Sequence, residues 1–398
     1  MRFLCGFLTP AAGRQYSVGV LKGCSEEMIK VLSIFGTRPE AIKMAPVVLE
    51  LQKHPGQIRS VVCVTAQHRE MLDQVLPVFG IAPEYDLDLM SPGQTLARIT
   101  ALAIEGLNQV IAQDRPDVVL VQGDTTSAFC GALAAYYQKR KVGHVEAGLR
   151  TGDKFAPYPE EINRRLVCPL TDYRFAPTEG AKAALLAEGV PASSIFVTGN
   201  TVIDALIRVR ERVSRERPVL PEGLAEAVEG GKMVLVTGHR RESFGEGFEN
   251  ICKAIRQVAD CSPDVLFVYP VHLNSNVQEP VRRILGGHKR ILLIEPLPYV
   301  PFVWLMDRAT VVLTDSGGVQ EEAPSLGKPV LVMRETTERP EGIAPGNARL
   351  VGTNKDRIVE HLLNLLTKPK ERAAMAAVPN PYGDGHAAER IVDILLGT

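Results

Sequence analysis

The fold of this 398-residue chain is indicated by the stretch Val311-Val312-Leu313-Thr314-Asp315-Ser316-Gly317-Gly318-Val319-Gln320-Glu321-Glu322. Its apolar run predicts a buried strand, and the polar residues and glycines predict a tight turn that opens a helix. Two glycines let the backbone approach a ligand closely. Free N–H groups and the positive end of the helix dipole then favour a diphosphate. Ser316 adds a hydroxyl, and Glu322 can accept hydrogen bonds from sugar hydroxyls. A turn of this composition also occurs as a purely structural connection in α/β proteins.

The same alternation of apolar run, polar turn and amphipathic stretch recurs along the chain from Met28. It is typical of parallel strands joined by helices. Ligands of open α/β sheets bind beyond the carboxyl ends of the strands, and nearly every concentrated polar run lies at such an end. We therefore expect an α/β protein with two doubly wound, Rossmann-like domains that face each other across a central cleft.

The domain boundary is expected near Asn200, before a charged helix and a Pro- and Glu-rich stretch around residues 215–231. This gives an N-terminal domain over residues 28–200 and a C-terminal domain over residues 201–374. A Pro/Gly turn then precedes a last helix within residues 375–398. Residues 1–27 lack the sustained apolar segment of a secretory signal. We interpret them as a disordered extension or the product of an upstream start codon, in preference to a targeting peptide.

The composition excludes several classes of function. A net charge of −1 gives no bulk attraction to nucleic acid or membrane, and no apolar run approaches the roughly 18 residues of a membrane span. Seven scattered cysteines without a C-x-x-C pair are typical of reduced thiols in a cytoplasmic protein. The chain has no complete G-x-G-x-x-G or G-x-x-x-x-G-K-[ST] loop, which disfavours nicotinamide and Walker-type nucleotides. No histidine–carboxylate cluster has metal-ligand spacing.

Three carboxylates are candidates for proton chemistry. Asp124 and Glu146 follow two consecutive predicted strands joined by one helix, so a right-handed crossover places them at the same edge of the sheet. Glu160 comes from the loop just after. Carboxylates that converge on a cleft suit proton abstraction and delivery. The structural alternative is that Asp124 caps the next helix and that the glutamates form ion pairs.

Basic residues in or just after the strand-end loops can hold a phosphorylated ligand, although solvated surface charge is the usual role of such residues. They are Arg38, Lys43, Arg240, Arg241 and Arg339. His239 follows Thr-Gly at a strand end, which favours a ligand contact over a purely structural role, and His68 is placed similarly.

The ordered set of strand-end motifs closely resembles the bacterial non-hydrolysing UDP-N-acetylglucosamine 2-epimerases. The motifs are Gly36-Thr37-Arg38-Pro39-Glu40, Thr65-Ala66-Gln67-His68-Arg69, Gly123-Asp124-Thr125-Thr126, His144-Val145-Glu146-Ala147-Gly148-Leu149-Arg150, Gly238-His239-Arg240-Arg241-Glu242 and Thr314-Asp315-Ser316-Gly317-Gly318. Each motif is weak alone, but the ordered set is highly specific and runs from Met28 almost to the end. Residues 1–27 fall outside it.

The resemblance implies a fold like the GT-B glycosyltransferases, with UDP in the cleft and a final helix that packs back on the first domain. It also implies a cytoplasmic homodimer that needs no nicotinamide or metal. The implied reaction interconverts UDP-N-acetylglucosamine and UDP-N-acetylmannosamine for cell-envelope polysaccharides. A base removes the C2 proton while UDP leaves C1, giving 2-acetamidoglucal, and UDP then adds back as C2 is protonated on the opposite face.

The resemblance also assigns residues. The acid/base candidates are Asp124, Glu146 and Glu160. The resemblance does not assign which of them acts on which face of C2. His239 and Arg38 would hold the diphosphate region, with Lys43 close by. The UDP pocket would be lined by Ser316, Gly317, Gly318, Glu322 and Arg339, with Phe302 near the uracil. Leu297 stands where some relatives are expected to carry a polar residue, which affects a minor uracil-side contact.

Bacterial members of this family are activated by UDP-N-acetylglucosamine bound next to the active site. Gln67, His68 and Glu70 match residues of that second site, so allosteric activation by the substrate is expected. Three alternatives remain open: a hydrolysing epimerase that releases N-acetylmannosamine, a GT-B glycosyltransferase, and a catalytically silent UDP-sugar sensor. Three carboxylates in the first domain fit proton chemistry at C2 better than acceptor activation, and the intact set of candidates argues against a sensor.

Overall fold

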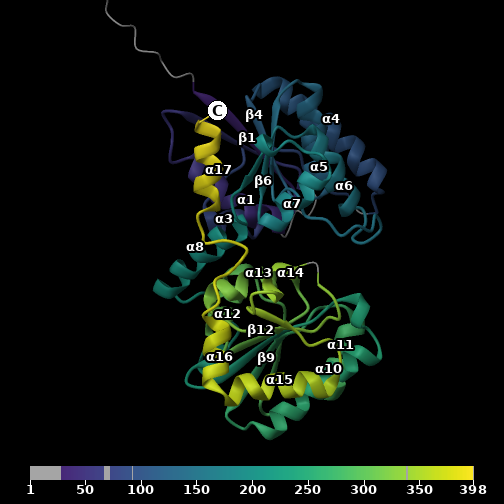
Figure 1. The fold of residues 1–398 in the computed structure, drawn as a ribbon, viewed down its shortest axis with the longest axis vertical. Helices are drawn as coiled ribbons and strands as arrows, with labels where there is room; N and C mark the ends of the chain where they lie inside the picture. Colours follow the sequence, from purple (N-terminus) through teal and green to yellow (C-terminus); the bar gives the residue numbers. More distant parts are fainter. Residues whose placement is uncertain (1–27, 67–71, 92, 338, 398) are drawn as a thin grey trace, which may run out of the picture.

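The computed structural model describes residues 28–66, 72–91, 93–337 and 339–397. These residues form two lobes, each built on a parallel sheet with helices on its faces, and Figure 1 shows the lobes one above the other. The α/β fold class expected from the alternating pattern is confirmed. No helix in the described ranges is long and apolar enough to cross a membrane.

The first sheet has seven strands in the order β3-β2-β1-β4-β5-β6-β7, and every pairing is parallel. The strands are β1 Ile29–Phe35, β2 Ile58–Val64, β3 Tyr85–Asp86, β4 Val118–Gln122, β5 Lys141–Val145, β6 Tyr173–Ala176 and β7 Ile195–Val197. The helices of this lobe are α1 Arg38–Leu51, α3 Leu76–Phe79, α4 Leu96–Asp114, α5 Thr126–Tyr137, α6 Glu160–Val167 and α7 Glu179–Ala187.

The second sheet has six strands in the order β10-β9-β8-β11-β12-β13, again all parallel. The strands are β8 Lys232–Thr237, β9 Val265–Pro270, β10 Ile291–Ile294, β11 Val311–Thr314, β12 Val330–Val332 and β13 Ala348–Leu350. The helices after β7 are α8 Thr201–Arg215, α9 Leu224–Val228, α10 Glu246–Cys261, α11 Ser275–Leu285, α12 Tyr299–Arg308, α13 Gly317–Glu322, α14 Pro340–Ile343, α15 Lys355–Thr367, α16 Pro369–Ala376 and α17 Ala387–Leu396.

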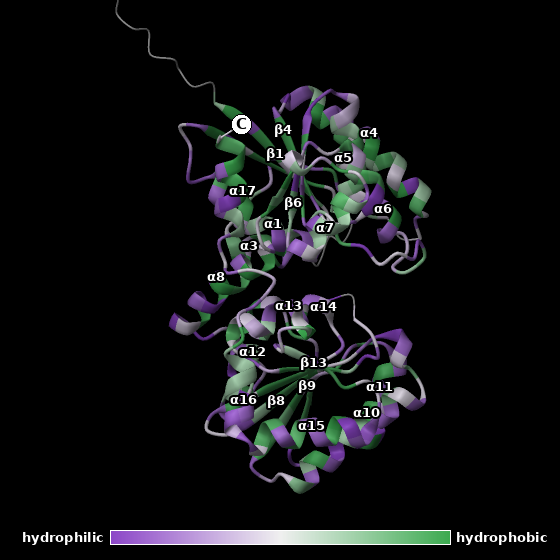
Figure 2. Cartoon of the chain, in the orientation of Figure 1, coloured by the Kyte–Doolittle hydropathy of each residue, from purple (hydrophilic) through white to green (hydrophobic). Residues whose placement is uncertain are grey.

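Burial explains the strand composition. The central strands are apolar on both faces because helices cover both sides of each sheet, and residues such as Val31, Leu120, Leu235 and Val312 have no exposed surface. Figure 2 shows the hydrophobic strands inside each lobe and hydrophilic residues on the outer faces of the helices. The sheets are thus rigid supports for the loops at their carboxyl ends.

The strand order of each sheet reverses direction at one point. In the first sheet the reversal lies between β1 and β4, and in the second it lies between β8 and β11. Loops that leave neighbouring strands in opposite directions open a crevice, which is where ligands of such sheets bind. The loops after β1, β4, β8 and β11 begin with Gly36, Gly123, Gly238 and Asp315, and they carry Asp124, His239 and Ser316 or lead directly into helices that begin with Arg38 and Gly317.

The last helix returns to the first lobe. In Figure 1 the yellow α17 lies beside α1, away from the second lobe that precedes it in the chain. The side chain of Asp204 in α8 accepts the backbone N–H of Ala388 at 2.8 Å, and the backbone N–H of Asn200 donates to the carbonyl of Tyr382 at 2.7 Å. The chain therefore crosses between the lobes twice, and the two crossings are bonded to each other.

Candidate active site

A cavity of about 450 Å³ lies between the lobes at the two reversal points. It brings together eight of the residues predicted from sequence: Arg38, Lys43, His239, Phe302, Ser316, Gly318, Glu322 and Arg339. Side chains from α1 form one wall, and the β11–α13 turn with the loops after β8 and β10 forms the other. The cavity is therefore built by both halves of the chain and needs both to be complete.

The first wall is positioned by the start of α1. Thr37 caps this helix in a capping box with Glu40, whose carboxylate accepts the backbone N–H groups of Gly36 at 3.0 Å and Thr37 at 2.8 Å. Glu40 also accepts the hydroxyl of Thr125 at 2.5 Å, which ties the loop after β1 to the loop after β4. Arg38 and Lys43, in the first two turns of α1, are thereby held at the cavity.

The opposite wall is the strand, turn and helix expected from residues 311–322. Ser316 is the N-cap of α13, and its backbone N–H donates to the hydroxyl of Thr314 at 2.9 Å. A Cβ added at Gly318 would meet no atom closer than 3.9 Å, so the absence of a side chain there leaves space in the cavity. The turn thus offers backbone N–H groups to an anionic ligand.

Glu322 lies one turn into α13, buried against α12. The hydroxyl of Tyr299 donates to Glu322 at 2.7 Å. Burial raises the pKa of Glu322 to about 7, although the hydrogen bond from Tyr299 acts in the opposite direction. The side chain can exchange between proton donor and acceptor near neutral pH, which suits a contact with ligand hydroxyls.

His239 is held by a residue that the sequence analysis did not select. The fully buried carboxylate of Asp315 accepts the backbone N–H groups of His239 at 2.7 Å and of Arg240 at 2.8 Å. The rings of His239 and His272 are stacked, with centroids 5.3 Å apart. The imidazole of His239 is therefore fixed at the cavity wall by its backbone and by its ring neighbour.

Glu146 is the most constrained of the three carboxylates. It accepts from the ammonium of Lys43 and from the amide of Gln122, and its backbone φ of +67° is unusual for a residue with a side chain. Burial acts to raise its pKa, but the charge and hydrogen bond of Lys43, together with the charges of Arg339 and Arg164, hold the pKa of Glu146 below its usual value. Glu146 is thus an ionised carboxylate in a fixed orientation.

Asp124 and Glu160 lie on the same side of the first lobe as Glu146, outside the lining of the 450 Å³ cavity. Asp124 forms an ion pair with Arg164 of α6, and its carbonyl accepts the amide of Asn163 at 2.9 Å. The helix after β4 is capped by Thr125, which removes the capping alternative for Asp124. Glu160 is the first residue of α6, and its Oε2 is buried without a hydrogen-bond partner among the described residues.

Glu321 was missed by the sequence analysis, although it adjoins Glu322. It is buried, lines the cavity and forms an ion pair with Arg339. Of the two glutamates that end the 311–322 stretch, only Glu322 was predicted as a site residue. The sequence of a six-residue helix does not show which of its faces is turned to a ligand cavity. Gln67, His68 and Glu70 lie outside the described residues.

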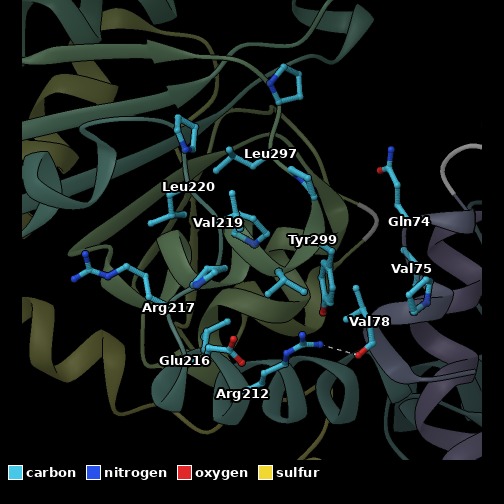
Figure 3. A pocket seen from close by; sticks show the side chains of 18 of the residues that line it. Gln74, Val75, Val78, Arg212, Glu216, Arg217, Val219, Leu220, Leu297 and Tyr299 are labelled. Atoms are coloured by element: carbon cyan, nitrogen blue, oxygen red, sulfur yellow. Dashed lines mark hydrogen bonds between the residues drawn. The ribbon is translucent and has the colours of Figure 1, made fainter.

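A second cavity of about 720 Å³ opens beside the first and shares Arg38, Pro296, Leu297 and Tyr299 with it. Figure 3 shows Gln74, Val75 and Val78 on one side and the stretch from Arg212 to Leu220 on the other. The guanidinium of Arg212 donates to the carbonyl of Val78 at 3.1 Å, which links α8 to α3 across this opening.

Comparisons with known proteins agree with the resemblance found in the motifs. The family model described as UDP-N-acetylglucosamine 2-epimerase matches residues 49–396. The UDP-N-acetylglucosamine 2-epimerases of Salmonella typhimurium and Escherichia coli K12 are each 58% identical to this chain, over 92% of it and 98% of their own length. A crystal structure of the Neisseria meningitidis enzyme bound to UDP-N-acetylglucosamine is 50% identical, with a TM-score of 0.83, and covers 93% of this chain and 100% of that one. The GT-B-like arrangement is thereby confirmed, and the chain belongs to the UDP-N-acetylglucosamine 2-epimerase family.

Proposed function

We propose that this protein interconverts UDP-N-acetylglucosamine and UDP-N-acetylmannosamine by elimination and re-addition of UDP. The observation that carries the proposal is the buried Glu146–Lys43 pair, which lies next to a cavity whose other wall presents the β11–α13 turn. Proton chemistry at C2 needs an oriented carboxylate, and a leaving diphosphate needs N–H groups and cations. In this cleft the carboxylate lies next to the cavity, and the N–H groups and cations line it.

In the forward direction a carboxylate takes the C2 proton while the bond between C1 and the diphosphate oxygen breaks. The electron pair of the C2–H bond forms the C1–C2 double bond of 2-acetamidoglucal, and UDP carries away the electrons of the C1–O bond. Addition of UDP to C1 with protonation of C2 on the other face completes the change. The steps consume and release no electrons. The base keeps the proton that it takes from C2, a second group gives a proton to the other face, and exchange with solvent restores both groups.

Glu146, Asp124 and Glu160 are the groups proposed for proton transfer on the two faces of C2. The nearby charges of Lys43 and Arg339 lower the pKa of Glu146 and keep it ionised, and the ionised carboxylate is the form that can accept the C2 proton. His239 and Arg38 are proposed to stabilise the departing diphosphate, and Arg38 and Lys43 would retain UDP for re-addition instead of releasing it.

The nucleotide part of the substrate is assigned to the second lobe. The hydroxyl of Ser316 and the backbone N–H groups of Gly317 and Gly318 would donate to the diphosphate, and Glu322 would accept the ribose hydroxyls. Phe302 and Arg339 line the same cavity. The bound UDP-N-acetylglucosamine in the Neisseria meningitidis relative supports a UDP-sugar as the ligand. The same proposal includes a cytoplasmic location and a role in cell-envelope polysaccharide synthesis.

A homodimer is part of the proposal. Two pairs of aromatic side chains are more than half exposed: Tyr136 and Tyr137 at the end of α5, and Phe155 and Tyr158 before α6. Aromatic side chains exposed in a group are typical of a protein interface. Light scattering of the purified protein is expected to give twice the chain mass, and a mass of one chain at micromolar concentration would contradict the dimer.

Substrate activation is proposed through Gln67, His68 and Glu70. The rate should then rise sigmoidally with the concentration of UDP-N-acetylmannosamine, and a trace of UDP-N-acetylglucosamine should make the curve hyperbolic. A hyperbolic curve that is unchanged by the added UDP-N-acetylglucosamine would contradict this activation.

Proton NMR of UDP-N-acetylglucosamine with the protein in D2O tests the reaction itself. UDP-N-acetylmannosamine with deuterium at C2 and no accumulating free sugar is the expected result. Free N-acetylmannosamine with equal UDP would instead identify a hydrolysing epimerase. Binding without any reaction would contradict epimerisation and favour a glycosyltransferase or a sensor.

A further inference from the structure

Asn200 connects the two walls of the cleft through its side-chain amide. It lies between β7 and α8, at the first crossing from one lobe to the other, and only 2% of its surface is exposed. Its Nδ2 donates to Glu146 Oε1 at 3.2 Å and to Glu321 Oε2 at 3.2 Å. Glu146 follows β5 in the first lobe, and Glu321 lies in α13 of the second.

The orientation of this amide is determined by its neighbours. Its Oδ1 accepts the backbone N–H of Val202 at 3.1 Å, which caps α8. An amide has one acceptor end and two N–H donors, so both donors must face the two carboxylates. The backbone of Asn200 is itself bonded to Tyr382, so the whole residue has little freedom to move.

Each of the two carboxylates bound by Asn200 is also paired with a cation. Lys43 is paired with Glu146, and Arg339 is paired with Glu321. Both cations and Glu321 line the nucleotide cavity, whereas Asn200 does not. The bridge therefore runs behind the cavity, from the carboxylate proposed for proton transfer to the arginine proposed for UDP.

We propose that Asn200 is a positioning residue for epimerisation, which holds the Glu146 carboxylate in register with the nucleotide-binding wall through Glu321 and Arg339. This inference rests on the proposed role of Glu146. A reacting carboxylate that is displaced by about 1 Å can lose about 100-fold in rate. Because Asn200 does not line the cavity, its loss should affect the chemical step and leave nucleotide affinity nearly intact.

Two substitutions separate this role from the helix cap. Serine and aspartate are both good N-caps, so Asn200→Ser and Asn200→Asp retain the bond to Val202. Serine is too short to donate to both carboxylates. Aspartate is isosteric but places a third carboxylate between the two. Asn354→Ser, at the N-cap of α15, is the matched control for the cap alone.

The expected result for Asn200→Ser is a kcat lower by about 100-fold, with KM and the Kd for UDP within about threefold of wild type. For Asn200→Asp, the loss in kcat is larger, and the acidic limb of the kcat–pH profile moves to higher pH because added negative charge favours protonation of Glu146. Asn354→Ser should match wild type in all three quantities.

Wild-type kcat in both variants would overturn the inference, and so would a parallel loss of kcat and UDP affinity. The wild-type protein is measured alongside by C2 deuterium exchange. Absence of exchange in the wild type would contradict the proposed function, whereas an active wild type with unaffected Asn200 variants would remove only the role of Asn200.

Discussion

The carboxylate of Asp315 accepts the backbone N–H of His239 at 2.7 Å, and its other oxygen lies 3.3 Å from Nδ1 of the same histidine. The two residues are 76 positions apart in the chain. They meet because β8 and β11 are neighbours at the reversal point of the second sheet. Sheet topology, and not local sequence, therefore fixes the orientation of His239 toward the cleft.

Asp315→Ala is expected to lower both stability and activity. Two backbone N–H groups lose their buried acceptor, and each unsatisfied donor costs about 1–3 kcal/mol. Urea unfolding should show a loss of about 2–6 kcal/mol by the same figure, and kcat/KM should fall because His239 is no longer held. Asp393→Ala, at an exposed position of α17, should change neither quantity. Unaltered stability of the Asp315 variant would refute this account.

Asp124→Asn and Glu146→Gln are expected to reduce turnover by about 10²–10⁴-fold, the usual contribution of a general acid or base. UDP should still bind to both variants, because neither residue lines the 450 Å³ cavity proposed for the nucleotide. Turnover is measured by NMR and UDP affinity by calorimetry. Glu179→Gln serves as the control, since its side chain is 77% exposed. Wild-type rates in either variant would remove that residue from the mechanism.

Glu322→Gln is expected to stabilise the ligand-free protein above neutral pH. The pKa of Glu322 is raised from 4.5 to about 7 in the folded state, so the folded protein binds the proton more tightly than the unfolded chain does. The penalty of ionising this carboxyl is absent below pH 4.5, grows as the pH rises, and is complete above about pH 7.

The melting temperature of the Glu322→Gln variant should therefore exceed that of the wild type at pH 8 and match it more closely at pH 4.5. Glu360→Gln, at an exposed position of α15, should give the same difference from wild type at both pH values. A stability advantage of the Glu322→Gln variant that is larger at the lower pH would show that the sign is wrong.

Gly318→Ala is expected to weaken UDP binding without loss of stability. The nearest atom that the added methyl group would meet is a carboxylate oxygen of Glu322 at 3.9 Å, which is an ordinary contact distance and not a clash. It would occupy cavity space proposed for the diphosphate. Calorimetry should show an affinity for UDP lower by at least about tenfold, or about 1.4 kcal/mol. Gly56→Ala, whose new Cβ meets nothing within 4 Å, is the control. Unchanged UDP affinity would place the diphosphate elsewhere.

The periodicity of the sequence was sufficient to predict the parallel α/β class and the segments that carry the candidate site. Apolar runs with both faces buried mark the strands, and the polar residues that follow them mark the edge where ligands bind. Arg38, Asp124, Glu146, His239 and Ser316 were all selected by this rule. Their positions follow from local composition, which is why one sequence could indicate them.

The functions of Asn200, Glu321 and Asp315 were not evident from the sequence. Asn200 is an ordinary helix cap by its position, and its second role depends on partners 54 and 121 residues away. A buried amide or carboxylate is assigned by the groups that it must satisfy, and those groups come together only when both lobes have folded and met. Thus the sequence by itself determined the elements, their order and the polar strand ends, because these depend on neighbours along the chain. Only the tertiary structure decided which of the polar groups pair across the cleft, because hydrogen bonding depends on distance in space.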